Sequence, residues 1–189
     1  MNHTPQIKKA IQFAAQKHHG QMRIACTDEP LPYITHLFSV ALLVAEGGAH
    51  DDVVTAALLH DTIEDTATTR EEIVTAFNER VAELVEAVSE KKHLDWKERK
   101  EEYLAHMQQV DEEALIIAIA DKVDNVESRI EEYEKEGENF LTHWKRPNED
   151  YLWFYGEALK MALARLPNHP LTLRYAEAQA KQLQSFTDK

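Results

Sequence analysis

Residues 53–66 read VVTAALLHDTIEDT, and this stretch predicts a buried helix with a polar cluster at its end. An apolar helical run stops at His60 and Asp61, and Glu64 and Asp65 each follow four positions later. If the helix continues, each later acid lies on the same face as one residue of the earlier pair, because residues i and i+4 share a face. Three carboxylates at the C-terminal end of a helix oppose its dipole. A divalent cation would resolve this conflict, since imidazole and carboxylate groups are its usual ligands.

The alternative interpretation is a solvated acidic helix end with a hydrogen-bonded histidine, and two further segments weigh against it. His36 follows the sequence PYIT and opens an apolar helix. Asp121 follows the run ALIIAIA, which is apolar on every side and is therefore predicted to be buried. An ionised carboxylate there needs a partner, because an unpaired buried charge is costly. The predicted metal ligands, drawn from three helices, are His36, His60, Asp61 and Asp121.

The composition limits the class of protein. The chain of 189 residues is predicted to form one domain, and its single cysteine, Cys26, excludes an intramolecular disulfide. We expect a cytoplasmic protein, because the chain lacks a long apolar run and its N-terminus lacks the pattern of a signal peptide. The formal net charge of −13 argues against nucleic acid and anionic membranes as partners. A homo-oligomer is compatible with the sequence.

Few glycines and prolines and a pervasive helical periodicity predict an all-α fold, a bundle of roughly eight to ten helices. Thr69 and Glu72 have the spacing of a capping box. We expect one domain over residues 1–189, with a core at 10–165 and a C-terminal helix at 168–186. The predicted helices cover residues 5–18, 33–47, 51–65, 69–77, 78–90, 96–109, 112–134, 148–165 and 170–186.

Taken together, the motifs resemble a known superfamily. A histidine, a later His-Asp pair and a final aspartate are the signature of the HD superfamily of metal-dependent phosphohydrolases. HDTIEDT, with ADKVDN downstream, is similar to the hydrolase domain of the RelA/SpoT family, and most of all to stand-alone small alarmone hydrolases. The resemblance spans Ala10 to Leu163 and includes PYITH, ERK and YLWFY. It implies an HD-type helical fold and hydrolysis of guanosine 3′,5′-bis(diphosphate) at its 3′-pyrophosphate.

The resemblance also implies roles for the polar residues. Mn²⁺ is the implied metal, with Fe, Zn, Ni and Mg as alternatives. Four protein ligands on an octahedral ion leave two positions for water and a substrate oxygen. Glu64 and Asp65 lie one helical turn beyond the ligands, where they can orient that water and accept its proton.

Four residues are expected to contact a nucleotide substrate. Carried over by position, Asn125 contacts the sugar or base, and Arg23 stacks on or pairs with the nucleotide. The alternative for Arg23 is an exposed loop charge. Tyr151 could face the pocket or belong to an aromatic core. Lys97 belongs to a basic cluster that could line the phosphate mouth, whereas Lys100 of that cluster is expected to pair with glutamates of its own segment.

Two positions depart from the resembled family, and both fall on the nucleotide side. This chain has Ile24 where a lysine is common, and Asp124 where a histidine or tyrosine is usual. The alternative functions are therefore another nucleotide phosphatase, acting on the 2′-phosphate of NADPH or on a nucleoside monophosphate, and a metal-binding module that senses a nucleotide without hydrolysing it.

Overall fold

Helices account for nearly all of the chain in the computed structural model, which describes residues 3–23, 30–90, 94–142 and 144–187. Within these residues the strand-like pairing is one isolated bridge between Met22 and Pro32. The predicted all-α class is confirmed. The helices are α1 (Pro5–Lys17), α2 (Ile34–Glu46), α3 (Asp51–Leu59), α4 (Thr62–Asp65), α5 (Arg70–Ala76), α6 (Glu79–Val88), α7 (Trp96–Met107), α8 (Glu112–Glu136), α9 (Asn139–Thr142), α10 (Asn148–Arg165) and α11 (Pro170–Thr187).

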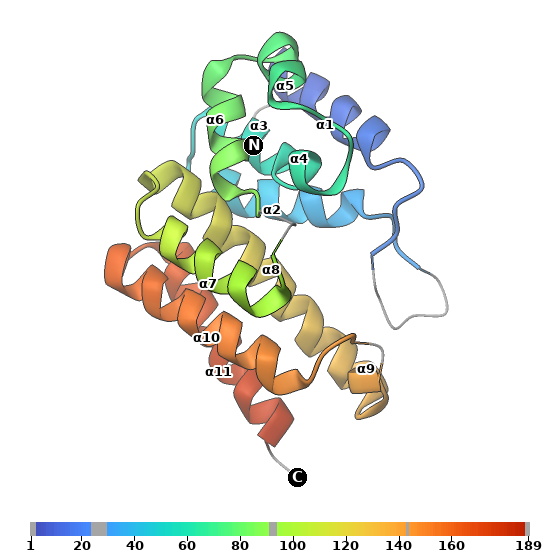
Figure 1. Cartoon of the computed structure of the whole chain (residues 1–189), viewed down its shortest axis with the longest axis vertical. Helices are drawn as coiled ribbons and strands as arrows, with labels where there is room; N and C mark the ends of the chain where they lie inside the picture. The colour runs from blue at the N-terminus through green and yellow to red at the C-terminus, as the bar shows by residue number, and fades with distance from the viewer. Residues whose placement is uncertain (1–2, 24–29, 91–93, 143, 188–189) are drawn as a thin grey trace.

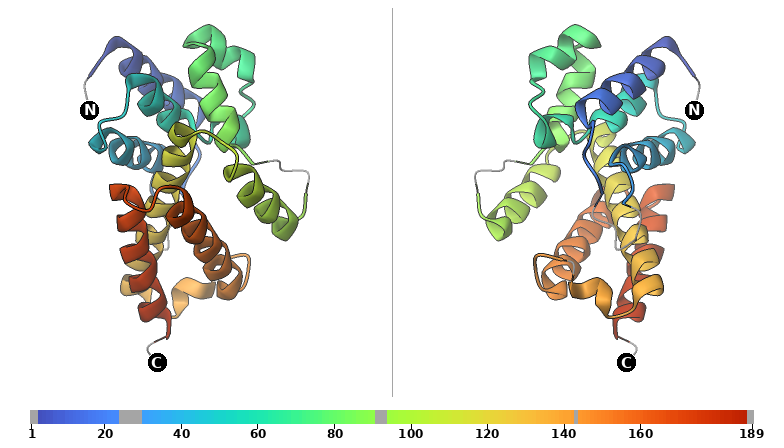
Figure 2. Two further views of the ribbon diagram at one scale, coloured as in Figure 1. Left: turned by 90° about the vertical axis from the view of Figure 1, so that its left-hand side faces the viewer. Right: turned by 90° about the vertical axis from the view of Figure 1, so that its right-hand side faces the viewer.

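The longest helix, α8, forms the axis of the molecule (Figures 1 and 2). It contacts α2, α3 and α6 of the N-terminal part and α9, α10 and α11 of the C-terminal part. Asp111 caps its first turn by accepting a hydrogen bond from the backbone N–H of Ala114. Gly137 ends it with a φ of 60°, a conformation that favours glycine. Residues from both parts of the chain can therefore meet on the surface of α8.

Local sequence signals position the other helices. Thr4 accepts a hydrogen bond from the N–H of Ile7 at the start of α1. Thr69 and Glu72 form the predicted capping box of α5, in which each side chain bonds to the other residue's backbone. The helix ends predicted from caps, prolines and glycines therefore agree with the structure to within a few residues.

The hydrophobic residues form one buried cluster, with members from Ile7 to Ala178. The apolar run before Asp121 lies in it: Leu115, Ile117 and Ala120 are fully buried, as predicted. One domain over residues 1–189 stays our interpretation of this cluster. The run brings Asp121 to the point where α2 and α3 meet α8, so burial of these apolar side chains positions the acid.

The predicted helix over residues 51–65 is wrong in one respect, because the structure divides it into α3 and α4. Asp61 has φ −93° and ψ 0°, between the usual helical and extended regions. In a continuous helix, adjacent side chains point about 100° apart. The interruption allows both His60 and Asp61 to face the same cluster. It also places Glu64 and Asp65 in α4 instead of in the last turn of α3.

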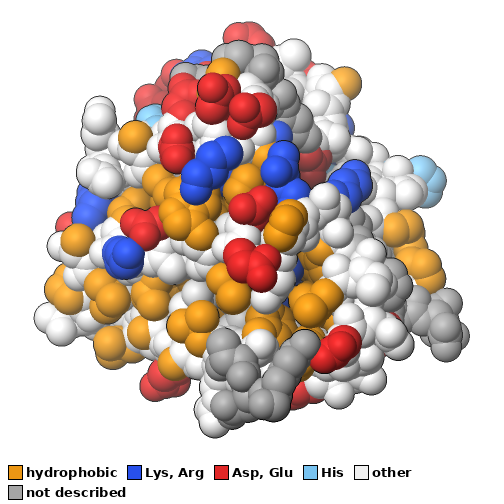
Figure 3. Space-filling model, turned by 60° about the horizontal axis from the view of Figure 1, so that its bottom comes forward, with side chains coloured by type: hydrophobic (Ala, Val, Ile, Leu, Met, Phe, Trp, Pro, Cys, Tyr) orange, Lys and Arg blue, Asp and Glu red, His pale blue; other side chains and the backbone are white. Residues whose placement is uncertain are grey.

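The face drawn in Figure 3 carries charges of both signs. In the face shown in Figure 3, basic side chains form small groups among acidic and hydrophobic ones. Among the described residues, we find no helix with both the length and the apolar character that a membrane crossing requires.

Candidate active site

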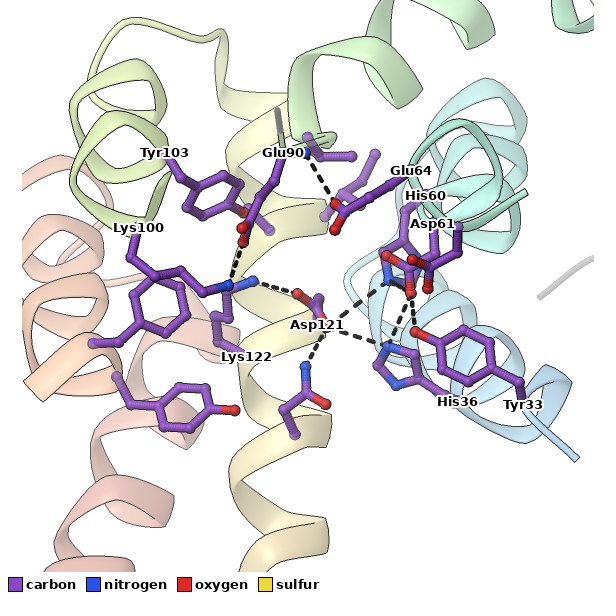
Figure 4. A pocket seen from close by; sticks show the side chains of 17 residues that line it. Tyr33, His36, His60, Asp61, Glu64, Glu90, Lys100, Tyr103, Asp121 and Lys122 are labelled. Atoms are coloured by element: carbon purple, nitrogen blue, oxygen red, sulfur yellow. Dashed lines mark hydrogen bonds and ion pairs between the residues drawn. The ribbon is translucent and has the colours of Figure 1, made fainter. Parts of the chain in front are cut away.

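Two imidazoles and two carboxylates converge where α2, the end of α3 and α8 meet (Figure 4). Asp121 Oδ1 lies 3.2 Å from His36 Nε2 and 3.8 Å from His60 Nε2. Asp61 Oδ2 lies 3.1 Å from His60 Nε2 and 3.7 Å from His36 Nε2. The structure therefore brings together all four residues that the sequence predicts as metal ligands. We call them the HD cluster.

The carboxylates favour positive charge at the centre of the HD cluster. Burial alone would lower the pKa of His36, but Asp121 and Asp124 outweigh it and leave this pKa above its usual value. Burial opposes the charge on His60 as well, yet the Asp61 carboxylate and its neighbours raise the pKa of His60 to about 9. A divalent cation would supply the positive charge that the imidazoles otherwise carry as protons.

Three of these donors, from His36, His60 and Asp121, lie within 4.8 Å of one another and fit one divalent cation, and Asp61 lies beside the two imidazoles. His60 Nε2 is buried and has no hydrogen-bond partner, although Asp61 Oδ2 lies 3.1 Å away. Atoms that bind one cation at about 2.0–2.2 Å lie at most about 4.4 Å apart. All four imidazole–carboxylate separations in the HD cluster meet this limit. The mixture of imidazole and carboxylate suits several divalent transition metals.

Each histidine is held by its second ring nitrogen. His36 Nδ1–H donates to Asp124 Oδ2 at 2.6 Å, and His60 Nδ1–H donates to the carbonyl oxygen of Ala57 at 2.9 Å. Both partners can only accept, so each bond leaves the Nε2 atom directed at the HD cluster. Such partners orient histidine ligands and make them more basic.

The two aspartates of the HD cluster also have fixed orientations. The hydroxyl of Tyr33 donates to Asp61 Oδ2 at 2.5 Å. Asn125 Nδ2 donates to Asp121 Oδ1 at 2.5 Å, and the Lys122 ammonium forms an ion pair with the other oxygen of Asp121. The predicted need of Asp121 for partners is thereby confirmed.

The HD cluster forms part of the wall of a cavity of about 160 Å³. Carboxylates outnumber ammonium groups among the residues that line it, which include Asp61, Glu64, Asp65, Glu90 and Asp121 against Lys100 and Lys122. This excess of negative charge attracts a cation more strongly than it attracts a polyphosphate. A bound cation would therefore make this cavity more favourable for an anionic substrate.

Glu64 and Asp65 line the same cavity, as the spacing of the motif predicts. Glu64 Oε2 accepts a hydrogen bond of 3.0 Å from the backbone N–H of Glu90. Burial raises the pKa of Glu64 to about 7, and the neighbouring Glu90 carboxylate adds to this rise. A carboxyl group with such a pKa is suited to proton transfer near neutral pH. Asp65 lies nearer the opening, where Gln21 Nε2 approaches its Oδ2 to 3.4 Å.

Two lysines face the HD cluster from the other side of the cavity (Figure 4). Lys122 is buried beside Asp121, which holds the pKa of this lysine above its usual value despite burial. Lys100 Nζ lies 2.5 Å from Glu90 Oε1, and burial lowers the pKa of Lys100. The expected pairing of Lys100 with glutamates of its own segment is therefore wrong. Glu90 pairs with two neighbouring cations of α7, since Arg99 Nε lies 2.9 Å from its other carboxylate oxygen.

A family model described as an HD domain matches residues 10–141. The chain belongs to the HD domain family. The predicted resemblance is confirmed, and the matched range includes the two histidines and two aspartates.

This HD domain protein is similar to pyrophosphohydrolases of guanosine 3′,5′-bis(diphosphate). It is 40% identical over 141 residues to the guanosine-3′,5′-bis(diphosphate) 3′-pyrophosphohydrolase MESH1 from Xenopus tropicalis. The aligned region covers 67% of this chain and 78% of that protein. It is 43% identical over 129 residues to the Aquifex aeolicus enzyme, covering 67% of this chain but only 18% of that protein. A solved structure of a metazoan SpoT ortholog that hydrolyses ppGpp superposes with a TM-score of 0.82, at 25% identity, over 96% of this chain and 98% of that one.

Arg23 is folded against α8 of the HD domain and is not an exposed loop charge. Its guanidinium donates to Asp124 Oδ2 at 2.8 Å, to Asn125 Oδ1 at 3.3 Å and to Ser128 Oγ at 3.1 Å. Asp124, noted in the sequence only as a departure from the family, thus connects Arg23 to His36. The other departure, Ile24, lies outside the described residues.

The two remaining predicted substrate contacts lie away from the residues that line this cavity. Lys97 is positioned over the ring of Trp153 and lies 3.9 Å from Glu101. Tyr151 is half-buried and packs edge-on against Trp96 and Trp144. Both assignments stay predictions. Lys122 is a functional residue that sequence reasoning missed, because its position next to Asp121 is the one feature that could have indicated it.

Proposed function

We propose that this HD domain protein is a metal-dependent phosphohydrolase that releases pyrophosphate from the 3′ position of guanosine 3′,5′-bis(diphosphate). The observation that carries the proposal is one cavity in which the HD cluster faces Glu64 and Asp65, with Arg23 and Asn125 beside it. Its relatives carry the name of this activity, at about 40% identity over two thirds of the chain. The net negative cavity also explains why a cation would be required for such an anionic substrate.

The metal ligands in this proposal are His36, His60 and Asp121, whose donor atoms form one group, and Asp61, which lies beside both imidazoles. Mn²⁺ is the proposed metal. Such an ion lowers the pKa of water and neutralises charge on a phosphoryl oxygen. Asp124 and the carbonyl of Ala57 keep the imidazoles turned toward the ion. Lys122 pairs with Asp121 Oδ2, which leaves Asp121 Oδ1 for the cation.

Glu64 and Asp65 are the proposed catalytic residues. Glu64 accepts a proton from the water that attacks the phosphorus bound to the sugar 3′-oxygen, and Asp65 orients that water from the cavity opening. The bond from the sugar oxygen to phosphorus breaks, and the oxygen leaves as the 3′-hydroxyl after taking up a proton. Lys100 and Lys122, on the far wall, compensate the charge of the departing pyrophosphate.

A substrate panel tests the reaction. We expect Mn²⁺-dependent release of pyrophosphate from guanosine tetraphosphate, with no orthophosphate as first product. NADPH and nucleoside monophosphates serve as competing substrates, because they would release orthophosphate. If pyrophosphate never appears while one of these yields orthophosphate, the alarmone reaction is wrong. The general assignment as an HD phosphohydrolase would then still hold.

A further inference from the structure

A second cavity, of about 150 Å³, continues from the first along α8. The two cavities share Tyr33, His36 and Asn125 as lining residues. The outer wall of the second cavity is formed by Arg23, Arg129, Glu132 and Trp144. A molecule held at the HD cluster can therefore reach this space.

The outer wall carries buried polar atoms that have no hydrogen-bond partner. They are Glu132 Oε2, Trp144 Nε1, and the Nε and one terminal nitrogen of Arg129. Glu132 is 8% exposed and Arg129 is 1% exposed, so water reaches neither group freely. Buried polar groups are normally paired, because leaving one unpaired costs its full desolvation energy. One acceptor and several N–H donors at a single cavity call for a ligand with the complementary pattern.

One face of α8 connects this wall to the metal site. Asp121, Asn125, Ser128 and Glu132 follow one another at spacings of four, three and four residues, which places them on the same side of the helix. At the rise of an α-helix, the eleven residues from Asp121 to Glu132 span about 16 Å. This distance suits a nucleotide with its 3′-phosphates at Asp121 and its base near Glu132.

Arg23 is prepared to stack on that base. Its hydrogen bonds to Asp124, Asn125 and Ser128 lie in the plane of the guanidinium, so the faces of the group stay available. The ion pair with Asp124 also compensates its charge, which makes Arg23 less suited to binding phosphate. Stacking on guanidinium planes with hydrogen bonds to the base edge is a common way of recognising an unpaired base.

We infer that Glu132 determines the base specificity of this enzyme, by accepting hydrogen bonds from the N1–H and the 2-amino group of guanine. Arg129 and Trp144 supply N–H donors for the oxygen and ring nitrogen of the same base. Adenine presents an acceptor at N1 and no 2-amino group, so a carboxylate at this place disfavours it. The inference rests on the proposed nucleotide substrate and adds the residue that selects the base.

Binding of nucleoside diphosphates in the presence of Mn²⁺ tests the inference without turnover. Calorimetry on the wild type should show the highest affinity for guanosine diphosphate, a lower one for inosine diphosphate and the lowest for adenosine diphosphate. Inosine ranks second because it lacks only the 2-amino group. We expect the affinities for the guanosine and adenosine compounds to differ by at least roughly 10-fold, which is the effect of a good bidentate contact. Glu132→Gln should reduce guanosine affinity by roughly 10-fold and bring it close to that of inosine. Equal binding of the guanosine and adenosine compounds by the wild type would overturn the inference.

Glu131→Gln is the matched control, because Glu131 is adjacent on α8 but exposed. It should leave all three affinities unchanged. Trp144→Phe keeps a ring and removes only the N–H, and it should weaken guanosine and inosine equally. If the Glu132→Gln protein melts like the wild type and keeps the base preference, Glu132 has no such role, even if guanosine tetraphosphate is hydrolysed. If hydrolysis fails but the preference depends on Glu132, the inference stands and the proposed reaction is wrong.

Discussion

Asp124 is the residue that joins the HD cluster to the nucleotide side, because one of its oxygens accepts from both His36 and Arg23. We predict that Asp124→Ala weakens Mn²⁺ binding by roughly 10- to 100-fold, the usual effect of removing a partner that orients a ligand. Asp124→Asn keeps an acceptor for the imidazole, so its affinity for Mn²⁺ should lie between those of the wild type and the Ala variant. A competition titration with a metal indicator measures the effect. Wild-type affinity in the Ala variant would show that His36 needs no such support.

Glu64 is expected to act in the reaction and not in binding. We predict that Glu64→Gln keeps its affinity for Mn²⁺ and nucleotide but loses roughly 10²- to 10⁴-fold in kcat, the contribution of a positioned base. Single-turnover kinetics separates this loss from product release. Glu71→Gln, on exposed α5, is the control. A Glu64→Gln enzyme with unchanged kcat would leave Glu64 only its hydrogen bond to the Glu90 backbone.

Residues differ in how well the sequence predicts them. His60 and Asp61 stand out because polar residues interrupt an apolar run, and a buried charge has few explanations. Glu132 gives no such signal. It has an acidic neighbour, Glu131, and local charge cannot tell which of the two is buried. That difference depends on α9 and α10 packing against α8, which the sequence of α8 alone does not contain.

Helix ends were more predictable than helix continuity. Thr69 and Glu72 cap α5 through bonds between neighbours in the chain, so local sequence is sufficient. The interruption between α3 and α4 depends instead on tertiary contacts. Asp61 lies at this interruption and contacts His60, His36 and Tyr33 there. Contacts between distant segments override local helix propensity there.

Two glycines in helices of this protein should respond oppositely to alanine. Gly137 ends α8 at a φ of 60°, where a side chain is strained whatever the space around it. We predict that Gly137→Ala lowers the free energy of unfolding by about 1–3 kcal/mol. Gly156 lies within α10 with open space around its Cα, so Gly156→Ala should raise it by about 0.5–1 kcal/mol. Denaturant titration measures the change in the free energy of unfolding for each variant. Changes of the same sign in both variants would contradict this prediction.

At the scale of the whole molecule, the metal is expected to hold the fold together. The HD cluster takes ligands from α2, from the turn after α3 and from α8, so one ion connects segments that are far apart in the chain. The net charge of −13 and the acidic cavity also favour binding of a cation by the folded state. The unfolded chain does not gather these ligands, so binding stabilises only the native protein.

We therefore predict that Mn²⁺ at 100 times its Kd raises the free energy of unfolding by about 2.7 kcal/mol, and that a chelator removes this gain. For a chain of this size the melting temperature should rise by roughly 5–10 °C. Calorimetry measures the shift, with a double variant, His60→Ala with Asp61→Ala, as control. That variant removes one imidazole and one carboxylate of the cluster and should melt at the same temperature with and without Mn²⁺. An equal rise in the variant would mean that the stabilising ion binds elsewhere on this acidic surface, and the assigned ligands would be wrong.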